Sequence, residues 1–466
     1  MVSDSIAFVS WQSAPFTDTL VRNALLSLPA INLASIYSTL PQQFNKLIQW
    51  SSYDEIDHTL IHSDHPHVLS SSYVIRKALI RKHFLSRCIH SFLVKHPHSV
   101  LRTAVPQTWE IEISFADELD DLWADELWDL SNILDKSMSI PSPETDHQWW
   151  ILKPGMADRG MGIRLFNSKE GLRQLLEGFD DDDDDDSPDG DEDGAADESE
   201  NNTSIAISQL RHFVIQEYLS KPLLLDPREV SLGDAPPQLI DQLQGHKFHL
   251  RAYCVASGDL TVYLYTRILA LFSSKPYSPP AAAADGVIDL LPHLTNSSLH
   301  THKGEECVRL LDELVGCHVL SGEASASEST LTLSHLADIQ DQIANSLAET
   351  FTAALQWPIY FQPMPNAFEL YGVDFLVEHV VSFKSQFQVK LLEINAEPAI
   401  ELTGSRLAWI LEDLFKAMAR VFVDPFVQDT PVEAWPVGQT RHFLKNCLQA
   451  EVRGSLHDSG KKIKAT

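Results

Sequence analysis

Apolar residues recur at regular spacing through the first third of the chain. Between residues 1 and 70, short apolar runs alternate with turn residues, which predicts a small α/β unit. Over residues 73–94 the apolar residues share one helical face and Arg and Lys the other, so we expect an amphipathic helix that Pro97 ends. Residues 115–135 alternate acids with Leu and Trp, which predicts a second, acidic helix.

Strand patterns dominate the rest of the chain. Residues 149–153 and 163–166 are apolar runs on either side of a glycine-containing loop, and we expect them to form a hairpin. Ser257-Gly258-Asp259 separates two longer runs that predict another hairpin. Three more strands and one helix are expected, the strands over residues 213–219, 371–378 and 388–394 and the helix over residues 331–355.

The acidic residues are concentrated in one segment. The 466-residue chain has a formal net charge of −30, but fourteen acids and no base lie between residues 180 and 200. Residues 180–204 also lack aromatic side chains, so they cannot bury enough apolar surface to offset chain entropy, and we expect disorder there. Because the remaining charge is still negative, the composition argues against a nucleic acid partner held on a broad basic face.

Several classes of protein do not fit the sequence. No run of about 18 apolar residues occurs, so we expect no membrane span. The first residues lack a basic segment followed by an apolar one, so we expect no secretory leader. Five cysteines without a C-x-x-C pair argue against a disulfide framework or a structural zinc site, and suit a cytoplasmic protein.

Three oxygen-bearing side chains lie on two of the predicted strands near the end of the chain. Asp374 lies in YGVDFLVE, and Glu393 and Asn395 lie two residues apart in LLEINAEP, so the latter two share one strand face. Carboxylates on apolar strands are costly to bury unless something pairs them. This all-oxygen set suits Mg²⁺ that bridges phosphate oxygens. Ordinary solvated acids beside a strand-end turn are the alternative.

A glycine-rich hairpin is the second candidate for phosphate binding. Lys153 ends an apolar strand, and glycines follow at positions 155, 160 and 162. Glycines let the backbone approach a phosphate closely, and Lys153 could reach the same group. The spacing matches neither the Walker loop nor the Rossmann fingerprint, so an ordinary tight turn remains the alternative.

Lys247, His249 and Arg251 alternate in GHKFHLRAY and therefore share one face of a strand. Three hydrogen-bond donors on one face suit an anionic ligand. A solvated edge strand is the alternative.

These features occur within segments that resemble the tubulin–tyrosine ligase-like family, an ATP-grasp group, and most closely its fungal, P-body-associated branch. The matching segments span roughly residues 73–405 and follow the family's order: RKALIRKHF, WWILKPGMADRGMGIRLF, FVIQEYLSKPLLL, GHKFHLRAY, PHLTN, FELYGVDFLV and LLEINAEP.

The resemblance implies an α/β (α+β) protein of ATP-grasp architecture with nucleotide bound between its last two domains. The expected parts are an N-terminal α/β domain (1–72), a central subdomain (73–148), a C-terminal antiparallel-sheet domain (149–430) carrying the acidic insert (180–204), and a C-terminal tail (431–466).

The resemblance also implies roles for residues by position. The residues expected to bind ATP are Lys77, Lys153, Gly160, Gly162, Gln216, Glu217, Leu219, Lys247, Arg251 and Asn296. Asp374, Glu393 and Asn395 are the expected Mg²⁺ ligands. The residues expected to act in catalysis are Lys247, Arg251 and Glu393.

The implied reaction uses ATP and Mg²⁺ to convert a protein carboxylate to an acyl phosphate, which the amine of a free amino acid then attacks. The expected acceptor is the tubulin C-terminal tail or another acidic protein tail. The chain departs from the family at two positions, with His249 in place of an aspartate and Leu271 in place of an arginine. In the family, both positions lie where the amino acid and the acceptor meet ATP.

These departures leave other functions open. The chain could be an ATP-binding relative that has lost catalysis and acts as an interaction module in cytoplasmic RNP granules. A carboxylate–amine ligase from elsewhere in the ATP-grasp class is a further alternative.

Overall fold

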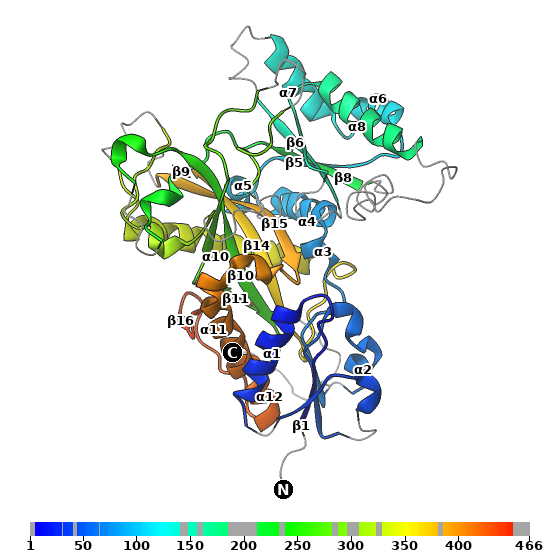
Figure 1. Ribbon diagram of the computed structural model, residues 1–466. Coiled ribbons are helices and arrows are strands. Elements are labelled where there is room, and N and C mark those ends of the chain that lie inside the picture. The colour runs from blue at the N-terminus through cyan, green and yellow to red at the C-terminus, as the bar shows by residue number, and fades with distance from the viewer. Residues whose placement is uncertain are drawn as a thin grey trace, which may run out of the picture.

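The computed structural model describes the chain as three sheets with their covering helices (Figure 1). None of the helices in this described part is long and apolar enough to cross a bilayer. The described residues are 5–29, 31–40, 44–64, 66–139, 148–155, 162–184, 212–232, 238–281, 288–295, 307–322, 329–380 and 385–450.

The N-terminal unit is a small parallel sheet with the strand order β2-β1-β3-β4. It confirms the expected α/β unit, because the short apolar runs are strands and helices pack against them. Its elements are β1 (Ser5–Phe8), α1 (Pro15–Leu26), β2 (Ile31–Ala34), β3 (Lys46–Gln49), α2 (His58–Ser63) and β4 (Val68–Ser70).

Each of the two predicted amphipathic helices is divided in two. The first is α3 (Lys77–Ile80) followed by α4 (Lys82–Lys95), because Arg81 takes an extended conformation between them. The acidic helix is α6 (Leu119–Ala124) and α7 (Trp128–Ser139). The break lets Leu127 become fully buried beside Leu119 in the core beneath the second sheet.

The second sheet is antiparallel, with the order β5-β8-β6-β7, and α6, α7 and α8 cover one of its faces (Figure 1). The β6–β7 hairpin confirms the predicted pairing of residues 149–153 with 163–166. Residues 185–204 of the expected acidic insert lie outside the described residues, and α8 continues into the insert as far as Asp184. The bounds are β5 (Thr108–Glu112), β6 (Trp150–Pro154), β7 (Arg164–Phe166), α8 (Lys169–Asp184) and β8 (His212–Glu217).

The third and largest sheet is built around one long central strand, β10 (His246–Ser257). This strand pairs with β14 along one edge and with β11 and β12 in succession along the other, so the predicted hairpin is confirmed with an interruption between β11 and β12. The other strands are β9 (Leu224–Leu225), β11 (Thr261–Tyr265), β12 (Leu269–Phe272), β13 (Val308–Leu310), β14 (Phe368–His379), β15 (Phe387–Ala396), β16 (Thr440–Arg441) and β17 (Leu444–Gln449).

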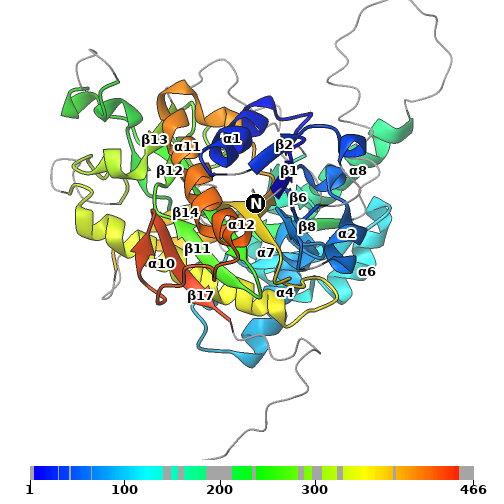
Figure 2. The same cartoon turned by 90° about the horizontal axis from the view of Figure 1, so that it is seen from below.

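Helices cover both faces of the large sheet, which explains why β10 is apolar throughout much of its length. On one face Leu250, Ala252 and Cys254 join the core that includes α10. On the other, Tyr253 and Val255 join the core that includes α11 and α1. Figure 2 shows α1 beside α11, so the N-terminal unit docks on the large sheet through this helix pair. The remaining helices are α5 (Leu101–Ala104), α10 (Leu333–Leu355), α11 (Ala408–Met418) and α12 (Asp424–Gln428).

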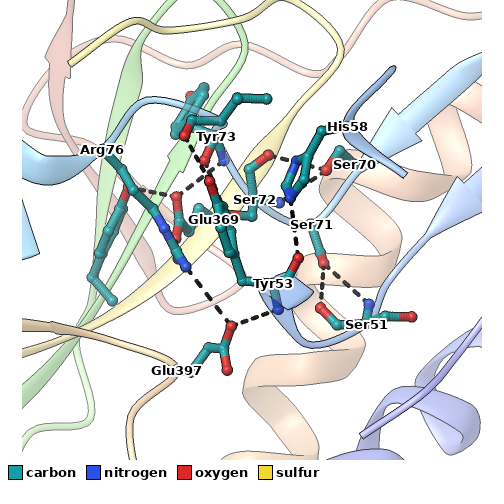
Figure 3. A network of polar contacts seen from close by, with 12 residues as sticks. Ser51, Tyr53, His58, Ser70, Ser71, Ser72, Tyr73, Arg76, Glu369 and Glu397 are labelled. Carbon is teal, nitrogen blue, oxygen red and sulfur yellow. Dashed lines mark hydrogen bonds and ion pairs between the residues drawn. The ribbon is translucent and has the colours of Figure 1, made fainter. Parts of the chain in front are cut away.

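A buried ion pair also joins the N-terminal unit to the large sheet (Figure 3). Arg76, just before α3, contacts the carboxylate of Glu369 on β14, and both side chains are almost completely buried. Tyr73 N–H and Tyr371 O–H donate to the second oxygen of that carboxylate, at 3.1 and 2.7 Å. The guanidinium lies 4.1 Å from the ring centroid of Tyr53. Every charge in this contact therefore has a partner.

Candidate functional site

A cavity lies between the second sheet and the large sheet, and its empty space of about 880 Å³ includes the open solvent at its mouth. Both sheets and the start of α4 contribute to its lining. The structure thus brings together many of the residues that the sequence predicted to bind ATP or metal. Those that line the cavity are Lys153, Gln216, Glu217, Leu219, Lys247, Asp374 and Glu393.

Two carboxylates on neighbouring strands line the cavity, and a β-bulge adjusts the strand that carries one of them. Asp374 on β14 pairs with Glu393 on β15, and the next pair is Phe375 with Leu391. Leu392 is therefore an extra residue, and it lines the cavity together with Glu393. Bulges of this kind re-aim side chains next to ligand sites.

Glu393 is held in its ionised form. Burial alone would raise the pKa of this carboxyl, but the charges of Lys82 and Lys153 and a hydrogen bond from Asn395 lower it to about 2. Lys82 Nζ lies 3.4 Å from Glu393 Oε2, and Asn395 Nδ2 donates to Oε1 at 3.3 Å. Asp374 accepts from Arg251 Nε and, at 3.0 Å, from Arg251 Nη2.

The chemistry of this donor set fits a magnesium ion that is shared with a ligand. Asp374 and Glu393 are two facing carboxylates, and Asn395 adds an amide next to them. Among the described residues no group of three or more His, Cys, Asp or Glu side chains gathers around one point. Mg²⁺ is usually bound by one or two carboxylates together with substrate phosphates, so the partial set is of the expected kind.

Two buried lysines face the carboxylates. Burial lowers the pKa of Lys153 to about 8, although the charge of Glu393 opposes that shift, and Lys153 Nζ donates to Gln216 Oε1 at 2.6 Å. Burial and the neighbouring Lys153 lower the pKa of Lys247 to about 7. Lys247 Nζ lies 4.3 Å from the ring centroid of Tyr218. A ligand that brings negative charge would stabilise the protonated form of both amines.

Apolar side chains form the walls of the cavity at the end of β8. Ile151 on β6 and Leu376 on β14 enter from the two sheets, and Leu219 follows β8. Together with Gln216 they supply apolar surface that could pack against a planar group, whereas the lysines and carboxylates supply the charged part of the lining.

Some of the predicted site residues lie elsewhere. Lys77 is exposed at the start of α3 and does not line the cavity, and Gly162 lies beside the lining residue Ile163 with a φ of 70°. Gly160 and Asn296 lie outside the described residues. Arg251 and Asn395 reach the site through their contacts with the two carboxylates.

The structure adds residues that sequence reasoning missed, above all Lys82 and Thr295. Lys82 follows Lys77 in the same RKALIRKHF segment, so the resemblance pointed to the segment but to a different lysine. Thr295 precedes Asn296 and contacts His249. No pattern in the sequence distinguishes either residue.

The two positions that depart from the family are neighbours. His249 on β10 pairs directly with Leu271 on β12, and both side chains are buried. His249 lines the cavity, whereas Leu271 packs in the core that includes α11.

Comparisons with known proteins agree on one family. Residues 62–431 match the model of the tubulin–tyrosine ligase family. The chain is 36% identical over 408 residues to the probable tubulin–tyrosine ligase PBY1 of Saccharomyces cerevisiae, which covers 84% of this chain and 49% of that protein. It is 35% identical over 383 residues to a probable tubulin–tyrosine ligase of Schizosaccharomyces pombe, covering 82% of this chain and 84% of the relative. The chain therefore spans about half of the length of the first relative and most of the second.

A solved structure extends the comparison to the fold. The C-terminal domain of K. lactis Pby1, described as an ATP-grasp enzyme interacting with the mRNA decapping enzyme Dcp2, superimposes with a TM-score of 0.62. It is 27% identical and covers 96% of this chain and 99% of that chain. The expected ATP-grasp architecture is confirmed.

Proposed function

The chain belongs to the tubulin–tyrosine ligase family, and from this premise we propose that it is an ATP- and Mg²⁺-dependent carboxylate–amine ligase. In the proposed reaction, an amino acid is added to a protein carboxylate through an acyl phosphate. The observation that carries the proposal is the cavity between the two sheets, where apolar walls, buried lysines and two paired carboxylates meet. These are the three environments that a base, a triphosphate and a divalent cation require.

The lining suggests how a nucleotide would lie. The base fits between Ile151 and Leu376, which approach from the two sheets, with Gln216, Glu217 and Leu219 at its edge. The phosphates would then extend toward Lys153 and the carboxylates. This orientation is supported because the amines of Lys82 and Lys153 lie beside the carboxylate of Glu393.

Asp374, Glu393 and Asn395 would hold the magnesium ion, whose chemistry is to neutralise charge on the phosphate oxygens. Glu393 is already ionised, as a ligand must be. Lys153, Lys247 and Arg251 would stabilise the negative charge that spreads over the transferred phosphoryl group.

The reaction balances in two steps. An oxygen of the acceptor carboxylate attacks the γ-phosphorus of ATP, and ADP leaves with the electrons of the broken bond. The amine of the amino acid attacks the acyl carbon, phosphate leaves, and the amine nitrogen loses a proton. We propose an acidic protein tail, such as that of tubulin, as the acceptor and a free amino acid as the amine, in a cytoplasmic setting.

A second candidate function is an ATP-binding interaction module. His249 and Leu271, at positions where the family carries charge, are the residues that favour it. The K. lactis neighbour is described as interacting with the mRNA decapping enzyme Dcp2, so a protein of this fold also serves as a binding partner.

One experiment separates the two functions. ATP hydrolysis by the purified chain is measured across a panel of amino acids, each with and without peptides of the tubulin tails. A ligase shows hydrolysis that requires one amino acid together with one peptide, and Lys153→Ala removes it. Mg-ATP binding without stimulation by any pair would refute the ligase proposal and favour the interaction module.

A further inference from the structure

A groove runs along α4 and meets the cavity between the two sheets. Residues of α4, of the segment from α5 to β5 and of β15 line this α4 groove, and its empty space of about 1420 Å³ includes the open solvent at its mouth. Lys82, Lys153 and Gln216 line both the groove and the cavity, so the two spaces adjoin there. Gln216 accepts a hydrogen bond from Lys153 at 2.6 Å and donates one at 3.3 Å to Thr108, which lines the groove. A ligand in the groove would therefore end beside the lysines that are proposed to meet the phosphates.

One face of α4 sets the length of the groove. Its lining residues recur every three or four positions from Lys82 to Val94, which places them on one side of the helix. Lys82 marks the inner end, where its amine lies 3.4 Å from Glu393, and Val94 marks the outer end, where it is 73% exposed. The helix rises roughly 18 Å between these two residues. An extended peptide advances roughly 3.3 Å per residue, so about five residues would fit between the two ends.

Apolar side chains line the groove along this length. Leu85, Ile89 and Leu93 come from α4, and Pro106 and Trp109 come from the segment that leads into β5. An apolar side chain of a ligand would be removed from water against this surface, and that burial stabilises the complex. The groove therefore favours a ligand that carries an apolar residue.

The charge of the groove is opposite to the charge of the chain. The chain has a formal net charge of −30, whereas the charged side chains that line the groove are Lys82, Arg102 and Lys153 against Asp129 alone. His90 adds a further polar group on the face of α4. A local basic surface attracts an acidic peptide that a chain of negative net charge otherwise repels. Charge complementarity thus identifies the ligand as acidic.

We propose that the α4 groove is the docking site of the acceptor, an extended acidic segment that carries one apolar residue about five residues from the carboxylate to be activated. The inference rests on the acceptor part of the proposed function and gives that acceptor a position and a sequence requirement. The carboxylate would lie at the inner end, beside Lys82 and Lys153. The apolar residue would lie at the outer end, beside Leu93 and Val94, which makes these two residues determinants of acceptor specificity.

The test is the affinity of the full chain for two labelled eight-residue peptides, measured by fluorescence anisotropy. One peptide consists of glutamate alone, and the other has leucine at its third position, five residues before its end. We expect the leucine peptide to bind about tenfold more tightly, because its side chain is removed from water in the groove. This comparison is made on the unaltered chain and does not depend on the folding of any variant.

Two variants at exposed positions locate the binding. Arg102→Glu should weaken both peptides by about tenfold because it reverses a charge in the groove, whereas Lys416→Glu on α11, which does not line the groove, should leave both affinities unchanged. Val94→Asp should remove most of the advantage of the leucine peptide. Its matched control is Val437→Asp, at a site that is 58% exposed and outside the groove, and this variant should keep the advantage.

The outcomes separate this inference from the proposed function. Equal affinities of the unaltered chain for the two peptides, or failure of both to bind, would refute the docking site. Equal affinities in Arg102→Glu and Lys416→Glu would refute it as well. If an amino acid and a peptide still stimulate ATP hydrolysis in any of these cases, the ligase proposal stands and its acceptor binds elsewhere. If no pair stimulates hydrolysis although the leucine peptide binds as expected, the ligase proposal fails and the groove remains a binding site for acidic segments.

Discussion

Binding of Mg-ATP should take up protons from solution at alkaline pH, because at that pH the two lysines of the cavity are largely neutral when it lacks a ligand. The shift of the Lys247 pKa from 10.5 to about 7 corresponds to roughly 5 kcal/mol in favour of the neutral amine. Lys153, with a pKa of about 8, adds a smaller contribution. The charge of a triphosphate favours the protonated form of both, so each pKa should return toward its ordinary value on binding.

The sign of the effect follows from the direction of the shift. Below pH 7 both amines are protonated with or without ligand, so binding takes up almost no protons. Near pH 9, above both pKa values, the amines of the free protein are largely neutral, and uptake should approach about two protons per nucleotide. The same shift destabilises the free protein below pH 7, and this penalty diminishes as pH rises from 7 to 10.5.

Titration calorimetry in pairs of buffers with different ionisation enthalpies gives the number of protons directly. Lys247→Met should reduce the uptake near pH 9 by about one proton, since one of the two titrating amines is gone. Lys416→Met, on the solvent side of α11, is the matched control and should leave the uptake unchanged. Uptake near zero at pH 9, or equal uptake in Lys247→Met and the unaltered chain, would refute the reasoning.

Three further changes have expected outcomes. Glu393→Gln should abolish the rise in melting temperature that Mg-ATP produces, because the ionised metal ligand is lost. The control Glu401→Gln, at an exposed position, should keep that rise, and equal rises in both variants would contradict the metal assignment. Glu369→Gln should lower the free energy of unfolding in urea by about 3–5 kcal/mol, since it removes the buried partner of Arg76 and leaves only the exposed Glu397, 3.8 Å away. A smaller loss in the double variant with Arg76→Met would identify the poorly paired Arg76 charge as the cause. Gly372→Ala should weaken Mg-ATP binding and cost about 1–3 kcal/mol of stability, because the added Cβ would lie 2.6 Å from Pro398 Cβ, next to the strand end that carries Asn395. Unchanged affinity in calorimetry would show that the packing of Gly372 against Pro398 does not position the site.

The longer strands of the large sheet were predictable because apolar residues dominate each of them between turn residues, whereas β9, β13, β16 and β17 were not predicted, and the last two lie within the expected C-terminal tail. The central strand β10 is buried on both faces, and such a strand has a strong local signal. The helices were harder to predict. Arg81 breaks the predicted helix over residues 73–94 although nothing in its sequence is unfavourable for a helix, so tertiary packing determines the break.

The polar end of the site was predictable in residue type but not in geometry. Glu393 and Asn395 were expected to share one face of the strand. In a regular strand that face would also carry the buried Val389 and Leu391, so both polar side chains would point into the core. The register shift at Leu392 turns it to the cavity instead. Lys82 could not be singled out either, because only the position of α4 against β15 brings its amine to Glu393.

The extra residue in β15 has a consequence for how sequences of this kind vary. The register between β15 and β14 changes by one residue at Leu392. The residues before Leu392 and those after it are therefore under different structural requirements. The first half must fit the packing of α10, where apolar residues of similar volume can exchange. The second half must present its oxygens to a ligand. A deletion or insertion of one residue between Val389 and Asn395 would turn Glu393 and Asn395 to the other face of the strand. The site would then be lost although the strand itself could still form. Relatives that bind nucleotide in this way should therefore conserve the number of residues between these positions more strictly than the residues themselves.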